Sequence, residues 1–262
     1  MTYFGFLLRF LVPPILILAL LAWRDHAHGR RLPQSLTGFP AWIVLGAHVV
    51  VAVAYTTPWD NYLVANRIWW YDPDLVTGLT LGWVPIEEYT FFVLQTLLTG
   101  LWLLFLARRL KEEPLQNSPR LRILSTVVLG LIWAAATTAF ILGWRRGAYL
   151  ALELAWALPP IMLQLAVGAD LLWQYRRLVL AALLPVLFYL SAADALAIGF
   201  GTWTINPEMT VNLKLGHLPL EEFVFFLLTN TLIVFGMTLS LANESQARMR
   251  RWTIAIRRRA AR

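Results

Sequence analysis

The sequence PIEEYTFF at residues 85–92 opens a long apolar segment, and PLEEFVFF at residues 219–226 opens a second one. Each copy places a proline before a pair of glutamates and a pair of phenylalanines after them. Charged side chains are costly to bury in a bilayer, and those found there usually have a function. The repeated pattern therefore indicates acidic side chains placed for chemistry at the ends of two membrane-spanning helices.

The composition points to a membrane protein, because 59% of the 262 residues are hydrophobic and there is no cysteine. A soluble domain of this length is far less apolar. A helix that spans a bilayer needs about 20 apolar residues. We therefore predict an all-α integral membrane protein with seven transmembrane helices. They are expected near residues 3–23, 39–57, 85–107, 123–142, 149–172, 179–198 and 219–241.

The net charge of +7 does not require a nucleic-acid partner, because the basic residues cluster after every second predicted span. Arg24, Arg108, Arg176 and Arg248 each belong to such a cluster. The positive-inside rule then predicts an N-terminus outside the cell membrane and a cytoplasmic C-terminus. The basic tail at residues 244–262 is either solvated or lies on anionic lipid.

The two glutamate motifs belong to a longer internal duplication. A shift of 134 positions aligns Pro85 with Pro219, and it also aligns Asp60 with Asp194 upstream. We predict two parallel three-helix repeats, joined by one connecting span. The predicted divisions are repeat 1 at 1–110, the connector with the fourth span at 111–147, repeat 2 at 148–243 and the tail at 244–262.

The glutamates have a plain interpretation, in which they only complement the dipoles of two helix N-termini. A second interpretation gains support from a polar stripe on the same helix faces. Gln95 lies two turns below Glu88, and Thr229 lies two turns below Glu222. A helix that faces only lipid does not need such a stripe. We therefore expect the repeats to enclose a largely apolar cavity lined by Glu87, Glu88, Glu221 and Glu222.

These residue types suit acid–base chemistry on an apolar substrate. A carboxyl group against aromatic rings in a dry site can stay protonated at neutral pH, donate a proton to an alkene, and leave a neighbouring carboxylate to take one back. Aromatic faces stabilise a cation between these steps. The predicted catalytic residues are Glu87, Glu88, Glu221 and Glu222. The predicted substrate-binding or cation-stabilising residues are Asp60, Asp194, Trp69, Tyr89, Phe91, Phe92, Gln95, Trp203, Phe223, Phe225, Phe226, Thr229 and Asn230.

Other interpretations of these side chains stay open. Many of the aromatic residues could form an interfacial belt, and Asp60 and Asp194 either orient the glutamates or bind water at the interface. The four histidines have no metal-ligand spacing, so no metal site is predicted. A nucleotide-binding fingerprint is also missing from the sequence.

The stretches at residues 55–64, 82–92 and 216–226 resemble the integral-membrane lycopene β-cyclases of archaea, some bacteria and fungi. The resemblance implies that lycopene enters from the bilayer and is cyclised through γ-carotene to β-carotene, without a cofactor. It also implies membrane lipid and other carotenoid-pathway enzymes as partners. The alternatives are a carotenoid hydratase of the same family, or a proton-coupled transporter built from two parallel repeats.

Overall fold

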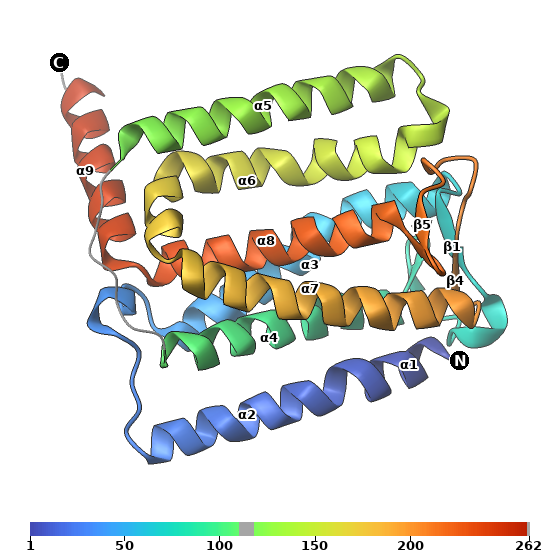
Figure 1. The fold of residues 1–262 in the computed structure, drawn as a ribbon, viewed down its shortest axis with the longest axis horizontal. Helices are drawn as coiled ribbons and strands as arrows, with labels where there is room; N and C mark the ends of the chain where they lie inside the picture. Colours follow the sequence, from blue (N-terminus) through green and yellow to red (C-terminus); the bar gives the residue numbers. More distant parts are fainter. Residues whose placement is uncertain (110–117, 261–262) are drawn as a thin grey trace.

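The computed structural model describes residues 1–109 and 118–260, and its long helices lie side by side in one bundle (Figure 1). The helices are α1 (Tyr3–Phe6), α2 (Val12–Ala27), α3 (Ala41–Ala65), α4 (Ile86–Ala107), α5 (Pro119–Ile141), α6 (Ala148–Gln174), α7 (Arg176–Gly199), α8 (Leu220–Leu241) and α9 (Asn243–Ala260). Within the described residues, seven helical segments are long and apolar enough to cross a membrane. The predicted fold class is thus confirmed.

Two of the predicted spans differ in detail from the structure. The first span is α1 joined to α2 by a π-helical turn at Leu7–Leu11. This turn ends two residues before Pro13, whose missing N–H and bulky ring disturb regular α-helical bonding. The second span continues eight residues beyond its predicted end at Thr57, so Asp60 lies inside α3 rather than just beyond it.

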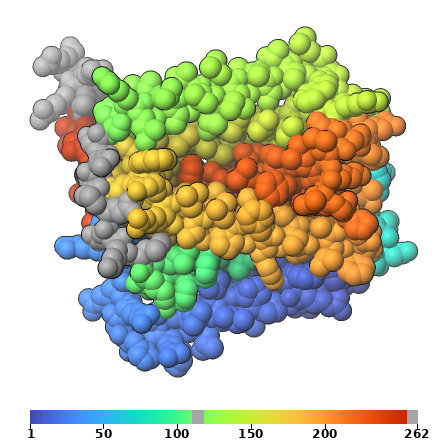
Figure 2. Space-filling view, in the orientation of Figure 1, coloured from blue at the N-terminus to red at the C-terminus, as the bar shows by residue number. Residues whose placement is uncertain are grey.

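The centre of the bundle is formed by α4, α7 and α8, because 56% of the most apolar stretch of each is buried. In contrast, none of the corresponding stretch of α5 is buried. Figure 2 shows α5 along one long edge of the molecule and α2 along the opposite edge. The helix of the connecting span therefore lies at the periphery, packed on α6.

Short strands, which the sequence did not predict, cover the end of the bundle near the N-terminus (Figure 1). They are β1 (Trp69–Tyr71), β2 (Thr80–Leu81), β3 (Val84–Pro85), β4 (Trp203–Ile205), β5 (Lys214–Leu215) and β6 (Leu218–Pro219). β2 pairs with β3, and β5 pairs with β6, each in a hairpin that leads into a glutamate motif. Gly82 and Gly216 turn these hairpins at φ values of 71° and 63°, which side chains with a Cβ disfavour.

The pairing of β1 with β4 joins the two halves of the chain. The strands are antiparallel, and Trp70 lies opposite Thr204, its equivalent under the shift of 134 positions. Trp69 and Tyr71 are paired in the same reciprocal way with Ile205 and Trp203. This register supports the predicted repeats, although their residue bounds stay predictions and the boundary at 110–111 lies outside the described residues.

At the opposite end of the bundle, buried aspartates form ion pairs with arginines. Arg109 donates two 2.7 Å hydrogen bonds to Asp25, and Arg248 donates to both oxygens of Asp170 at 2.7 and 2.8 Å. The second pair attaches the start of α9 to α6. The basic tail therefore begins as a helix docked on the bundle, while Trp252 is exposed.

Candidate active site

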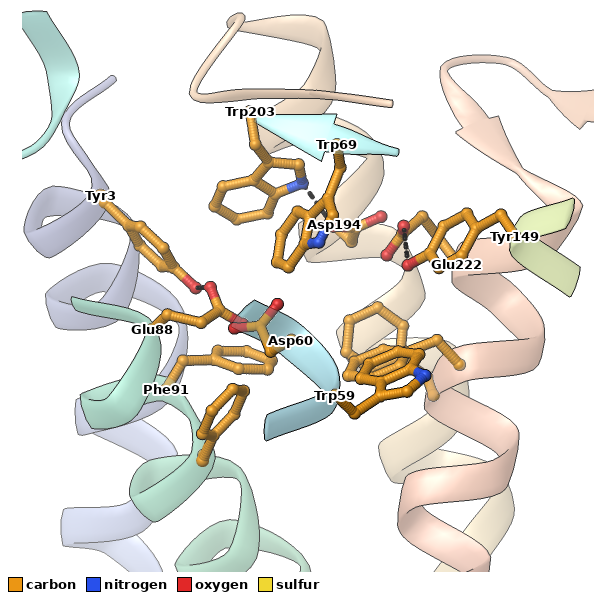
Figure 3. A pocket seen from close by; sticks show the side chains of 13 residues that line it. Tyr3, Trp59, Asp60, Trp69, Glu88, Phe91, Tyr149, Asp194, Trp203 and Glu222 are labelled. Atoms are coloured by element: carbon orange, nitrogen blue, oxygen red, sulfur yellow. Dashed lines mark hydrogen bonds between the residues drawn. The ribbon is translucent and has the colours of Figure 1, made fainter. Parts of the chain in front are cut away.

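A small chamber lies beneath the strands, where both glutamate motifs meet (Figure 3). Its volume is about 20 Å³, which is about the space that one buried water requires. The lining consists of four acidic and nine aromatic side chains. They are Tyr3, Trp59, Asp60, Trp69, Glu88, Phe91, Phe92, Tyr149, Asp194, Trp203, Glu222, Phe225 and Phe226.

Two glutamates face each other from the first turns of α4 and α8. Glu88 and Glu222 are 3% and 5% exposed. The Tyr3 hydroxyl donates a hydrogen bond to Glu88, and the Tyr149 hydroxyl donates one of 2.8 Å to Glu222. Each carboxyl group is therefore held in place by a tyrosine from the start of another helix.

Two aspartates complete the acidic lining from α3 and α7. Asp60 and Asp194 are both 1% exposed. The Trp203 indole N–H donates a 3.0 Å hydrogen bond to Asp194. Among the described residues, neither oxygen of Asp60 has a hydrogen-bond partner. The Trp69 indole, which belongs to the same lining, nevertheless interacts with this carboxyl group.

The chamber has no cationic side chain in its lining. Four carboxylates cannot all be charged in such a small, apolar space, because the charges repel each other and have lost their water. The group must therefore retain protons, shared among its members. Among the described residues, no cluster of three acidic or histidine side chains is placed to hold a metal ion. The arrangement suits the transfer of protons.

Aromatic rings form the remaining walls. Phe91 of α4 contacts Phe226 of α8 edge to face at 6.2 Å between ring centroids. The Trp59 ring stacks on Phe225 at 5.9 Å. Ring faces attract a cation, most strongly where water is excluded. The walls can therefore stabilise positive charge without supplying a base of their own.

All four glutamates were predicted to line one cavity, but only Glu88 and Glu222 line the chamber. Glu87 and Glu221 do not belong to the chamber lining. Each accepts a 2.7 Å hydrogen bond from a loop N–H, Glu87 from Thr77 and Glu221 from Val211. Adjacent residues in a helix point in different directions, so one glutamate of each pair faces the chamber and the other fixes the preceding loop. The catalytic role predicted for these two residues stays a prediction.

Three other predicted binding residues lie away from the chamber. The Tyr89 hydroxyl donates to the Leu81 carbonyl at 2.7 Å and so fastens the β2–β3 hairpin. Phe223 packs against Phe188 at 6.1 Å. Asn230 is fully buried and accepts a 2.6 Å hydrogen bond from Thr99. In this structure these side chains support the framework.

Gln95 and Thr229 belong to a second cavity of about 250 Å³ that lies farther along the bundle. The Gln95 amide donates a 2.8 Å hydrogen bond to the Thr229 hydroxyl. Phe92 and Phe225 line both this cavity and the chamber. The two spaces are therefore separated by phenylalanine side chains from the two glutamate motifs.

Sequence reasoning missed Tyr3, Tyr149 and Trp59. A signal for the tyrosines was present, because the shift of 146 positions that aligns Pro13 with Pro159 also aligns Tyr3 with Tyr149. Trp59 directly precedes Asp60 in the sequence and could have been included with it.

A further tyrosine, Tyr71, contacts Tyr3 and Trp69 of the chamber lining. It lies in β1 and stacks on Tyr3 at 6.0 Å. Burial raises the pKa of the Tyr71 hydroxyl, and the nearby carboxyl groups of Asp60 and Glu88 raise it further. Tyr71 therefore keeps its proton and can act as a hydrogen-bond donor near the chamber.

Comparison with known proteins identifies one family. The family model described as lycopene cyclase matches residues 2–106 and 127–240. A lycopene beta-cyclase of Halobacterium salinarum is 40% identical over 197 residues, which cover 74% of this chain and 81% of the relative. No solved structure matches this chain.

Fungal relatives are longer and carry two activities in their names. A bifunctional lycopene cyclase/phytoene synthase of Aspergillus niger is 36% identical over 196 residues, which cover 72% of this chain and 33% of the relative. The corresponding protein of Podospora anserina is 39% identical over 207 residues, which cover 75% of this chain and 35% of the relative. The matched region thus spans about a third of these fungal proteins.

Proposed function

This chain belongs to the lycopene cyclase family, and from that premise we propose that it cyclises the acyclic ends of lycopene to β-rings, giving γ-carotene and then β-carotene. One observation carries the proposal. Four buried carboxyl groups and nine aromatic side chains line a single chamber that has no cation in its lining. Such a chamber suits a reaction that begins and ends with a proton transfer and passes through a carbocation.

The reaction has three steps. A carboxylic acid protonates the terminal double bond of lycopene, which leaves a tertiary cation. The neighbouring internal alkene attacks this cation and closes a six-membered ring, and a carboxylate then removes a ring proton to form the β-end. Substrate and product are isomers, so the steps balance without electrons and need no redox cofactor. The enzyme class that follows is a non-redox intramolecular lyase, or isomerase.

We assign the proton transfers to Glu88, Glu222, Asp60 and Asp194, which are the acidic residues of the chamber. Tyr3 and Tyr149 orient the two glutamates through their hydroxyl groups. General acid–base groups typically contribute about 10²–10⁴-fold to a rate. The aromatic walls stabilise the cation until the second proton transfer occurs.

A chamber of about 20 Å³ is too small for a six-membered carbon ring. The end of the substrate must therefore move aromatic side chains apart as it binds. Phe92 and Phe225 are placed for this, because the larger cavity lies directly behind them. Tight closure around the cation would also exclude water, which otherwise adds to the cation and gives a hydrated product.

The function is tested by expressing the chain in a bacterium that accumulates lycopene. Chromatography and mass spectrometry of the pigment should show cyclic products of the same mass as lycopene. A product heavier by one water would indicate a carotenoid hydratase with the same first step. Unchanged lycopene, with the protein present in the membrane, would contradict both activities.

The cellular setting completes the proposal. The enzyme lies in the cell membrane with its N-terminus outside and takes lycopene and γ-carotene from the surrounding lipid. Other enzymes of carotenoid synthesis are expected partners, a view supported by the fungal relatives whose names combine a cyclase with a synthase.

A further inference from the structure

The cavity of about 250 Å³ lies among α3, α4, α6 and α8, within the membrane-spanning part of the bundle. Most of its lining is apolar, and several of its polar groups bond within the protein. The lining residues are Ala47, His48, Val51, Ala52, Tyr55, Thr56, Phe92, Gln95, Thr96, Trp156, Pro160, Gln164, Phe225, Thr229, Leu232 and Ile233. The His48 ring, for example, hydrogen-bonds the Val44 carbonyl at 2.7 Å.

Two aromatic side chains of the cavity lining contact each other at the surface of the bundle. Tyr55 of α3 stacks on Trp156 of α6 at 5.4 Å between ring centroids. The Tyr55 hydroxyl donates a 2.9 Å hydrogen bond to the Trp156 carbonyl, and the Trp156 indole donates one of 3.5 Å to the Tyr55 carbonyl. Tyr55 is 41% exposed, on a surface that faces the bilayer.

These side chains join two helices whose backbones do not pack closely on each other. α3 packs on α4 and α8, whereas α6 packs on α5 and α8. Trp59 stacks on Trp156 at 4.4 Å and on Phe225 at 5.9 Å between ring centroids. A row of stacked rings thus leads from the lipid surface to the chamber.

The other half of the chain has the same hydrogen bond but larger side chains at two of the equivalent positions. There, the Tyr189 hydroxyl donates a 2.7 Å hydrogen bond to the Phe10 carbonyl. Leu190 and Val186 replace Thr56 and Ala52 under the shift of 134 positions, and both are buried. Larger apolar side chains therefore fill the position that is hollow between α3 and α6.

We propose that the cavity between α3 and α6 is the lateral passage by which the polyene chain reaches the chamber from the bilayer, with Tyr55 and Trp156 as its outer gate. The inference rests on the proposed function and adds to it the route and the bound position of the substrate. Pockets that enclose a drug-sized ligand have volumes of about 300–1,000 Å³. A cavity of about 250 Å³ encloses only part of a carotenoid, so the remainder extends through the gate into lipid.

The chain contains no cysteine, so single cysteines can be introduced and labelled without other changes. Ala52 lines the cavity, whereas Ala54, on the same helix, is exposed and does not line it. Ala52→Cys is the test variant, and Ala54→Cys is its matched control. Both are labelled in membranes with benzyl methanethiosulfonate, which dithiothreitol removes, and the extent of labelling is measured by mass spectrometry.

Labelled Ala52→Cys is expected to lose most of its lycopene conversion and to recover it after dithiothreitol. Labelled Ala54→Cys should convert lycopene at its unlabelled rate. Lycopene added before the reagent should slow labelling at position 52 and leave labelling at position 54 unchanged. This protection measures binding in the cavity without any need for turnover.

Two outcomes would overturn the passage while leaving the proposed function intact. One is full conversion by Ala52→Cys when it is labelled to completion. The other is that the reagent does not label position 52, or that lycopene does not slow its labelling. If unlabelled and wild-type proteins both fail to convert lycopene, the proposed function fails instead. The protection experiment would then still show whether a polyene occupies the cavity.

Discussion

The side-chain amide of Gln95 donates a 2.8 Å hydrogen bond to the hydroxyl of Thr229, and these residues occupy equivalent positions 134 apart in the two halves of the chain. Residues related in this way can touch only where the two halves meet. Nearby, Phe91 contacts Phe226, again from α4 to α8. The chamber therefore lies where the two halves face each other, and residues of both should be needed for activity.

Glu88→Gln and Glu222→Gln should each lower the rate of lycopene cyclisation by about 10²–10⁴-fold, because the amide keeps the size of the acid but cannot donate or accept the catalytic proton. Rates are measured by chromatography of pigment from membranes with equal amounts of protein. Glu87→Gln and Glu221→Gln are the matched controls, since the side chains of Glu87 and Glu221 accept hydrogen bonds from backbone N–H groups outside the chamber. Equal losses in all four variants would contradict this division of roles.

Tyr3→Phe and Tyr149→Phe should slow cyclisation by about tenfold or more, since each removes a hydrogen bond to a chamber carboxyl group but keeps the ring. The dependence of the rate on pH should also change, because the carboxyl group loses a donor. Tyr89→Phe is the control, as its hydroxyl bonds to the Leu81 carbonyl in a hairpin. An unchanged rate and pH profile in both test variants would mean that these tyrosines do not orient the acids.

Arg248→Ala should reduce the free energy of unfolding by about 3–5 kcal/mol, because it leaves the buried Asp170 carboxylate without its main partner. The side chains of this pair are 5% and 1% exposed. Arg251→Ala should cost about 0–1 kcal/mol, because Arg251 is 64% exposed in its pair with Glu244. Denaturant unfolding in detergent measures both values, and similar losses would argue against a structural role for the Asp170 pair.

Reporter fusions should place the N-terminus outside and the C-terminus in the cytoplasm. The basic residues after alternate spans motivate this expectation through the positive-inside rule. Alkaline phosphatase fused at the N-terminal side and a cytoplasmic fluorescent protein at the C-terminal side provide the two readouts. Finding both ends in the same compartment would contradict an odd number of spans.

Purified protein in liposomes should convert lycopene without added flavin, nicotinamide or metal, because the proposed steps balance in atoms and electrons. In heavy water the new ring should contain deuterium, since the initiating proton comes from an exchangeable carboxyl group. Mass spectrometry of the product gives the deuterium content. Cyclic product without deuterium, or a strict requirement for reduced flavin, would rule out the proposed proton source.

The fold class could be predicted because hydrophobic segments of sufficient length have few alternatives to a transmembrane helix. The chamber residues Glu88 and Glu222 could be proposed because their motif occurs twice. The sequence did not distinguish them from Glu87 and Glu221, because the distinction depends on the direction in which each side chain points. The loop N–H groups of Thr77 and Val211 donate hydrogen bonds to Glu87 and Glu221, and they come from segments without a clear sequence pattern.

The strands and the second cavity were beyond prediction for another reason. β1 and β4 have only three residues each, which is too short for an alternating pattern to stand out. The cavity results from the sizes of side chains on several helices, such as Thr56 in one half and Leu190 in the other. Such differences in side-chain size predict a cavity only when the residues that pack against each side chain are known.

The register of β1 and β4, centred on Trp70 and Thr204, has the form of contact that two copies of one polypeptide make in a symmetric dimer. Two identical chains of half this length would pair their strands in the same reciprocal register. Two identical chains, however, would have carried either two lateral passages or none. Within one chain the two halves can differ, and here Ala52 and Thr56 line a cavity, whereas Val186 and Leu190, at the positions 134 residues later, are buried apolar side chains.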